Sequence, residues 1–175
     1  MEADIIIDQI LEVYKTQLGG DFEKYRNHAC RVYSLCTLLH GKKQDHEKFA
    51  IAAAFHDLGI WVNNTFDYLE PSISLAKEWL AQHEKDELSA EISLMIDMHH
   101  KVSQYTGEFA ETVEVFRKAD LIDLSFGTLT FGLSRKQFQK LIQRFPTKGF
   151  HRFLIRKTFQ NFLKHPLRPL PMFRK

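Results

Sequence analysis

The stretch Phe49-Ala50-Ile51-Ala52-Ala53-Ala54-Phe55-His56-Asp57-Leu58-Gly59 decides the fold of this chain. An apolar, alanine-rich run is followed directly by a histidine and an aspartate, and a glycine then interrupts it. Burying either polar side chain without a partner would cost on the order of a few kcal/mol. The two side chains therefore either bond to backbone at the end of a buried helix or bind a ligand such as a metal ion. The choice depends on whether the rest of the chain supplies matching ligands.

The composition is that of an ordinary globular protein, with 44% hydrophobic and 26% charged residues. The 175 residues are most simply one domain, 1–175, with a core at about 22–126 and C-terminal helices with a basic tail at about 134–175. We expect no secretory signal, and no apolar stretch approaches the roughly 18 residues of a membrane helix. Cys30 and Cys36 share one apolar segment, which favours reduced core thiols in a cytoplasmic protein.

Charge is unevenly distributed along the chain, although the net charge is only +2. No acidic residue follows Asp123. The cations of that same part are Arg135, Lys136, Lys140, Arg144, Lys148, Arg152, Arg156, Lys157, Lys164, Arg168, Arg174 and Lys175. A basic C-terminal third favours an anionic partner, such as a phosphate ligand, a nucleic acid or a membrane surface. The alternative is a solvated helix face that pairs with the acidic N-terminal half.

Helical periodicity runs through almost the whole chain, and no alternating strand pattern stands out, so we predict an all-α fold. Asp21, Asp45 and Ser134 are candidate N-caps, and Pro71 suits the start of a helix, where its missing N–H costs nothing. The predicted helices lie at about 4–18, 21–39, 45–57, 71–82, 87–99, 111–124, 134–145 and 150–163.

Two further polar residues fall on apolar stripes of these helices and match the doublet. His28 lies on the core-facing side of the 21–39 helix, and Asp120 lies on the buried stripe of the 111–124 helix. A helical bundle can bring both together with His56 and Asp57. Two imidazoles and two carboxylates suit a divalent metal such as Mn, Fe, Co, Ni, Zn or Mg. The alternative is four independent buried polar residues, each satisfied locally.

The order His, then His-Asp, then Asp in an all-helical chain resembles the HD superfamily of metal-dependent phosphohydrolases. The matching segments are Asn27-His28-Ala29-Cys30-Arg31-Val32, Ala54-Phe55-His56-Asp57-Leu58-Gly59 and Lys118-Ala119-Asp120-Leu121-Ile122-Asp123. The resemblance covers roughly residues 22–126. It implies an all-α bundle with the metal site in its core, and His28, His56, Asp57 and Asp120 as the metal ligands.

Two more segments are similar to accessory parts of HD phosphodiesterases that bind two metals. His99-His100-Lys101 matches a His or His-His after the fifth helix, whereas Glu70-Pro71 stands where those proteins have His-Pro. We therefore expect these residues to line the same cleft as the metal. The stretch 65–72 also looks like small bacterial HD proteins described only as predicted phosphohydrolases. We expect His40, His46 and His83 to lie outside the cleft.

The leading hypothesis is hydrolysis of a small phosphate ester or anhydride, such as a nucleotide, by metal-activated water. Candidates to orient the water or accept its proton are Asp57, Glu70, Asp123 and His99. Candidates to hold the phosphate are Arg31, Lys101 and His100. For the two cations among these, an ordinary surface charge is the alternative. Competing hypotheses are a non-catalytic, metal-stabilised module that senses a nucleotide or binds a partner, and an HD-type mixed-valent di-iron oxygenase.

The phenylalanines of the basic C-terminal third decide between a nucleic-acid surface and a packed helix. They are Phe138, Phe145, Phe150, Phe153, Phe159 and Phe162. On the 150–163 helix most cations fall away from the apolar positions, as in an amphipathic helix that packs on a core. We therefore predict that these phenylalanines are buried, that nucleic acid is not the main partner, and that the protein has no membrane partner.

Overall fold

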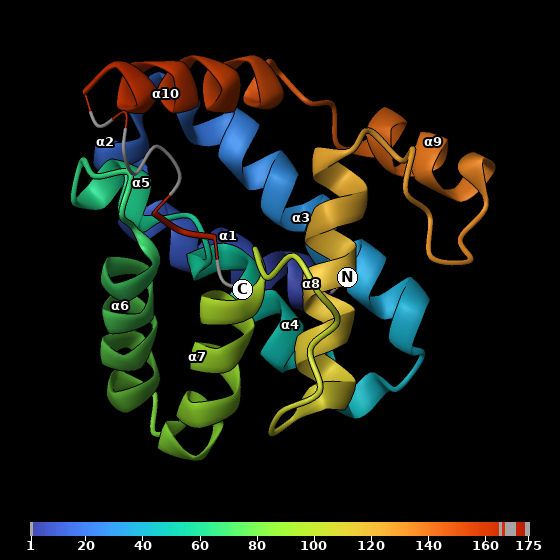
Figure 1. Cartoon of the computed structure of the whole chain (residues 1–175). Helices are drawn as coiled ribbons and strands as arrows, with labels where there is room; N and C mark the ends of the chain where they lie inside the picture. Colours follow the sequence, from blue (N-terminus) through green and yellow to red (C-terminus); the bar gives the residue numbers. More distant parts are fainter. Residues whose placement is uncertain (1, 165, 167–170, 174–175) are drawn as a thin grey trace.

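The computed structural model describes residues 2–164, 166 and 171–173, and every regular element within them is helical. The predicted all-α class is therefore confirmed. Figure 1 shows the α-helices, which are α1 Glu2–Val13, α2 Lys15–Leu18, α3 Phe22–His40, α4 His46–Phe55, α5 Gly59–Val62, α6 Leu69–Gln82, α7 Ser89–Met98, α8 Ala110–Leu124, α9 Arg135–Arg144 and α10 Phe150–Lys164. Short 3-10 turns at Gly19–Asp21, Lys43–Asp45 and Asp86–Leu88 precede α3, α4 and α7.

The alanine-rich helix α4 forms the centre of the bundle. All of its residues from 49 to 55 are buried, and α1, α3, α6 and α7 pack around it. A helix that is covered on every side is apolar at every position, which explains why this stretch has no polar face. The alanines at 50 and 52–54 leave room for the neighbouring helices to approach closely.

The remaining long helices place the ends of α4 and α7 next to α3 and α8. In Figure 1, α7 runs between α6 and α8, and α3 packs along α8. The C-terminal end of α4 points into the space that these helices enclose. Polar residues at that end are consequently buried, although they follow the entirely apolar stretch 49–55.

Most helix ends lie within about two residues of the predicted boundaries, but the helix predicted over 4–18 is divided at Tyr14 into α1 and α2. Not all ends use the predicted capping contacts. Ser134 caps α9 in a capping box with Gln137, as predicted. Asp21 and Asp45 precede their helices without capping them, because their carboxylates bind nearby cations instead. Helix α6 begins two residues before Pro71, which still falls in the first turn, where backbone N–H groups have no partner within the helix.

The prediction that the C-terminal phenylalanines are all buried is wrong for two of them. Phe150 and Phe153 are buried, whereas Phe159 and Phe162 are 61% and 48% exposed. Nine residues separate Phe150 from Phe159, so at roughly 100° per residue they lie on opposite sides of the helix. Because α10 lies across the end of α3 (Figure 1), only one of its sides can pack on the bundle.

The basic tail predicted after the last helix lies mostly outside the described residues. Of that tail the structure describes residues 166 and 171–173. In Figure 1 the short red segment 171–173 lies close to the C-terminal end of α7. Within the part of the chain that the structure describes, no helix has the length and apolar character needed to span a membrane.

Candidate metal centre

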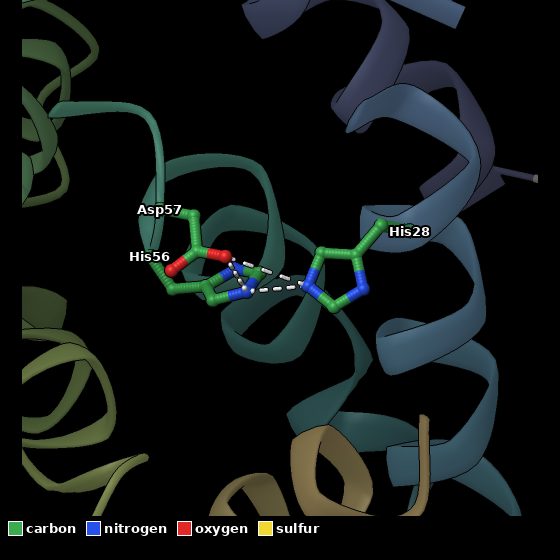
Figure 2. Close-up of side chains that lie close together, drawn as sticks. All are labelled: His28, His56 and Asp57. Atoms are coloured by element: carbon green, nitrogen blue, oxygen red, sulfur yellow. Dashed lines mark hydrogen bonds and ion pairs between the residues drawn. The ribbon is translucent and has the colours of Figure 1, made fainter. Parts of the chain in front are cut away.

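Three helices send polar side chains to one buried point in the middle of the bundle. His28 comes from α3, His56 and Asp57 follow directly after α4, and Asp120 comes from α8. All four residues are buried. Figure 2 shows the imidazoles of His28 and His56 pointing toward each other, with the Asp57 carboxylate beside them. The structure thus brings together the four residues that the sequence singles out as ligands.

The facing atoms lie within the span of a single coordination sphere. The Nε2 atoms of His28 and His56 are 2.9 Å apart. Asp57 Oδ2 lies 3.7 Å from the first of these nitrogens and 3.5 Å from the second. Asp120 Oδ1 lies 3.6 Å and 3.8 Å from the same two atoms. Ligand atoms around an ion at about 2.0–2.2 Å stand at similar separations from one another.

The other nitrogen of each ring fixes which atom faces the centre. His56 Nδ1 donates to the carbonyl of Ala53 at 2.9 Å, and His28 Nδ1 donates to Asp123 Oδ2 at 2.7 Å. In the neutral rings both Nε2 atoms therefore carry lone pairs and no hydrogen. When both carboxylates are ionised, two imidazole lone pairs and two carboxylate oxygens converge without a donor between them. Such a set of acceptors fits a cation and does not fit a hydrogen-bond network.

A second group of ligand-type atoms adjoins the first on the side of α7. His99 Nε2 lies 3.5 Å from Asp57 Oδ1, and His100 Nδ1 lies 3.9 Å from Asp120 Oδ2. Asp57 Oδ1, His99 Nε2 and Asp120 Oδ2 are buried and have no hydrogen-bond partner among the described residues. Asp57, His99 and His100 form a second set whose atoms lie close enough to share an ion. The two oxygens of Asp57 thus face two different sets.

Burial and like charge make the centre electrostatically unfavourable without a cation. Burial lowers the pKa of His56 to about 3, against the attraction of Asp57. Burial also raises the pKa of the Asp120 carboxyl to about 7, and the nearby charge of Asp57 adds to this effect. Burial alone would raise the pKa of Asp57, but the surrounding imidazoles hold this pKa below its ordinary value. A cation between the carboxylates would let both ionise at neutral pH.

Asp123 and Arg31 lie behind His28 and do not face the centre. Both are fully buried, and Arg31 donates from Nε to Asp123 Oδ1 at 2.6 Å and from a terminal nitrogen to Oδ2 at 2.8 Å. Arg31 also donates to the carbonyl of Phe145. Burial would raise the pKa of Asp123, but His28 and Arg31 hold it well below its ordinary value. The geometry therefore corrects both predicted roles: Asp123 orients His28 and Arg31 anchors Asp123.

The turn after Asp57 is held by contacts that need a glycine. A Cβ atom on Gly59 would lie 2.7 Å from the carbonyl oxygen of Tyr68, closer than real Cβ contacts allow. The N–H of Gly59 donates to Ser72 Oγ at 3.0 Å. On the other side, the hydroxyl of Tyr25 donates to the carbonyl of Ala54 at 2.9 Å. These contacts fix the backbone that presents the His-Asp doublet.

A cavity of about 400 Å³ opens onto the second group of ligand atoms. Its polar lining consists of Asp57, Tyr68, His99, His100, Lys101, Arg117, Asp120 and Thr158. The apolar lining consists of Phe66, Val102, Leu121, Leu124, Leu154, Met172 and Phe173. The sequence-based reasoning predicted Lys101 here but missed Arg117, which lies one turn before Asp120 on the same helix. The Arg117 guanidinium is held by both oxygens of Glu114 and points one nitrogen at the carbonyl of Lys101.

Glu70 does not take the predicted place in this cleft, and Tyr68 is there instead. The Glu70 side chain is exposed at the start of α6 and is not part of the cavity lining. Tyr68 is buried, and its hydroxyl hydrogen-bonds to His100 Nε2 at 2.7 Å. Because the helix begins at Leu69, Tyr68 at its N-cap turns inward while Glu70 turns to solvent. The aromatic residues between α5 and α6 could have indicated this contact from the sequence.

The histidines predicted to lie outside the cleft do so. His83 is exposed, stacks on Trp79 and donates from Nδ1 to the carbonyl of that residue. His40 bonds to Asp45, and His46 contacts the hydroxyl of Tyr33. None of these three belongs to either ligand set among the described residues.

Comparisons of the chain with protein-family models, with curated proteins and with solved structures found no match. The interpretation of the centre therefore rests on its own geometry and chemistry.

Proposed function

We propose that this protein is a metal-dependent phosphohydrolase of the HD type that acts on a small phosphate ester. The observation that carries the proposal is the convergence of four buried acceptor atoms, from His28, His56, Asp57 and Asp120, with no donor between them. A cation resolves that arrangement, and the adjoining cavity is large enough for a small ligand. The resemblance of the three sequence segments to the HD superfamily supports the same conclusion.

The donor set fits two divalent ions better than one. His28, His56 and Asp57 would hold the first ion, together with Asp120, which lies beside both imidazoles. Asp57, His99 and His100 would hold the second. The unpartnered, buried atoms of Asp57, His99 and Asp120 support the second position. In this arrangement His99 is a ligand, and the proton acceptor suggested by the sequence is not needed, because a metal-bound water is already acidic.

The chain's own residues bind and orient the substrate at this centre. Divalent ions held here would polarise a phosphoryl oxygen and lower the pKa of bound water. Lys101 places positive charge beside the cavity, where it can balance a phosphate group, whereas the charge of Arg117 is already paired with Glu114. The Arg31–Asp123 pair keeps His28 in the tautomer that faces the centre. The hydrogen bond between the Tyr68 hydroxyl and His100 Nε2 fixes the orientation of the His100 ring.

The test is release of inorganic phosphate from a panel of phosphate monoesters, diesters and nucleotides, with Mn, Co, Ni or Mg. We expect turnover that a chelator abolishes. The turnover rate of an Asp57→Asn variant should be lower by at least two orders of magnitude. Asp86→Asn makes the same chemical change at an exposed position and serves as the matched control. Oxygen consumption with iron in place of phosphate release would support the di-iron oxygenase. Tight metal binding without either activity would support the non-catalytic module.

A further inference from the structure

A second hollow adjoins the metal cavity between α10 and the C-terminal end of α8. It measures about 530 Å³, and its apolar lining consists of Leu124, Phe126, Leu154, Ile155, Phe159 and Phe162. Only His151 and Thr158 add polar atoms to the lining, and it contains no charged side chain. His151 is itself covered, because its ring stacks on Phe126 with the centroids 3.8 Å apart. We refer to this hollow as the outer groove.

The outer groove leaves large apolar side chains exposed next to one another. Ile155 and Phe159 are 68% and 61% exposed. Contiguous apolar surface of this kind on a soluble protein marks a place where an apolar ligand or partner binds. Because the lining carries no charge, an apolar occupant would displace water without leaving an ionised group unsolvated.

Three side chains, Leu124, Leu154 and Thr158, line both the outer groove and the metal cavity. On one side of these residues lie the ligand atoms of Asp57, His99 and Asp120, and on the other side lies apolar surface. A ligand that follows this path would carry its anionic end at the metal centre and an apolar part beyond Thr158.

The charge of α10 disfavours a second copy of the chain as the occupant. Arg152 and Arg156 are exposed on the same helix, and no acidic residue follows Asp123 in the chain. Two copies packed through this face would bring like charges together. An amphiphile whose anionic end lies at the metal centre places only its apolar part in the outer groove and brings no like charge to this face.

We infer that the substrate is an amphiphilic phosphate ester, whose phosphate lies at the metal centre and whose apolar chain crosses Thr158 into the outer groove. The inference rests on the proposed function and names its substrate class. The reaction is hydrolysis of the phosphate ester bond: water adds to phosphorus, the P–O bond to the chain breaks, and the alcohol leaves with a proton from that water. The products are inorganic phosphate and an apolar alcohol, and no redox partner is required.

The test uses n-alkyl phosphates and n-alkylphosphonates of two to ten carbons, below their micelle-forming concentrations, with the manganese-loaded protein. Phosphonates cannot be hydrolysed at the C–P bond in this way, so their binding by calorimetry reports on the groove independently of turnover. We expect affinity to rise about two- to fourfold for each added methylene that enters the groove. The kcat/KM of the phosphates should follow the same trend.

Two substitutions test whether the alkyl chain of the ligand lies in the outer groove. Phe159→Ser should flatten the dependence on chain length while leaving ethyl phosphate hydrolysis unchanged, and Thr158→Trp should block chains that reach past the junction. Leu163→Ser is the matched control, because Leu163 is 65% exposed on the same helix and lies outside the lining.

The outcomes separate this inference from the proposed function. Affinity that is independent of chain length, or a chain-length dependence that Phe159→Ser leaves intact, would overturn the inference even if short phosphate esters are hydrolysed. Chain-dependent phosphonate binding without hydrolysis of any ester would overturn the proposed function while supporting the groove. Hydrolysis that rises with chain length in the wild type and is flat in Phe159→Ser supports both.

Discussion

Replacing Asp120 with asparagine should stabilise the metal-free protein while removing its affinity for metal. Burial raises the pKa of this carboxyl from 3.8 to about 7 in the metal-free fold. Because the folded state then holds the proton more tightly than the unfolded state, the free energy of unfolding falls as pH rises from about 4 to about 7. At about 1.4 kcal/mol per pKa unit, ionised Asp120 destabilises the fold by about 4 kcal/mol at pH 8.

Asparagine has a similar shape and no charge, so the variant avoids this cost. For a chain of this size the difference corresponds to a melting temperature about 8–16 °C higher for metal-free Asp120→Asn at pH 8. The advantage should shrink as pH is lowered toward 4. Adding manganese should narrow the difference, because saturating the wild type to about 100 times its Kd adds about 2.7 kcal/mol per site, and the variant should gain little at the first site.

The assay is thermal and denaturant unfolding at pH 5 and pH 8, after chelation and again with manganese. Asp86→Asn, at an exposed position, should behave as wild type under every condition. If metal-free Asp120→Asn melts below the wild type at pH 8, or if manganese stabilises both equally, Asp120 is a structural hydrogen-bonding residue. The assignment of the centre would then be wrong at that position.

Three further predictions follow from the contacts around the centre. Metal affinity should rise about tenfold per pH unit up to about pH 7 and then level off, because the Asp120 carboxyl, whose pKa is about 7, must lose its proton to bind the metal. Calorimetry in buffers of different ionisation enthalpy should detect the released proton. A metal affinity that is independent of pH would contradict this prediction. Tyr68→Phe removes the hydroxyl bonded to His100 and should weaken the second ion by roughly 10–100-fold while sparing the first, as read by titration with manganese; equal loss at both ions would argue against separate positions. Gly59→Ala should lower the free energy of unfolding by about 1–3 kcal/mol, because its Cβ clashes with the Tyr68 carbonyl. Gly20→Ala, where a Cβ meets open space, should be nearly neutral. Similar denaturation midpoints for the two variants would refute the packing argument.

The ligand set could be predicted from the sequence because its positions follow helix periodicity. His28 and Asp120 interrupt apolar stripes, and the doublet of His56 and Asp57 follows the entirely apolar run 49–55. A polar residue at such a position must point into the core, since its helix packs on that face. The pattern therefore located the interior side chains before any tertiary contact was known.

The roles of Arg31 and Asp123, which lie behind His28 and away from the centre, could not be predicted in the same way. Arg31 lies one turn after His28, which suggested that both reach the same pocket. Instead the Arg31 guanidinium turns to Asp123 and the Phe145 carbonyl. Which of two buried polar groups faces the cavity depends on partners far away in sequence, and periodicity does not contain that information.

Errors at Glu70 and Phe159 arose from placing single residues at helix ends and on helix faces. A shift of two residues in the start of α6 turned Tyr68 inward and Glu70 outward. On α10, the apolar residues form two bands, and only the band of Phe150 and Phe153 finds a packing partner. The sequence shows both bands but does not show which neighbour covers each one.

The most direct test of the metal centre is anomalous diffraction from crystals of the manganese-loaded protein. We expect one anomalous peak at about 2.0–2.2 Å from the Nε2 atoms of His28 and His56, and a second beside Asp57 Oδ1, His99 and His100. A map without a peak at either position, or peaks only at surface residues such as His83, would contradict this expectation.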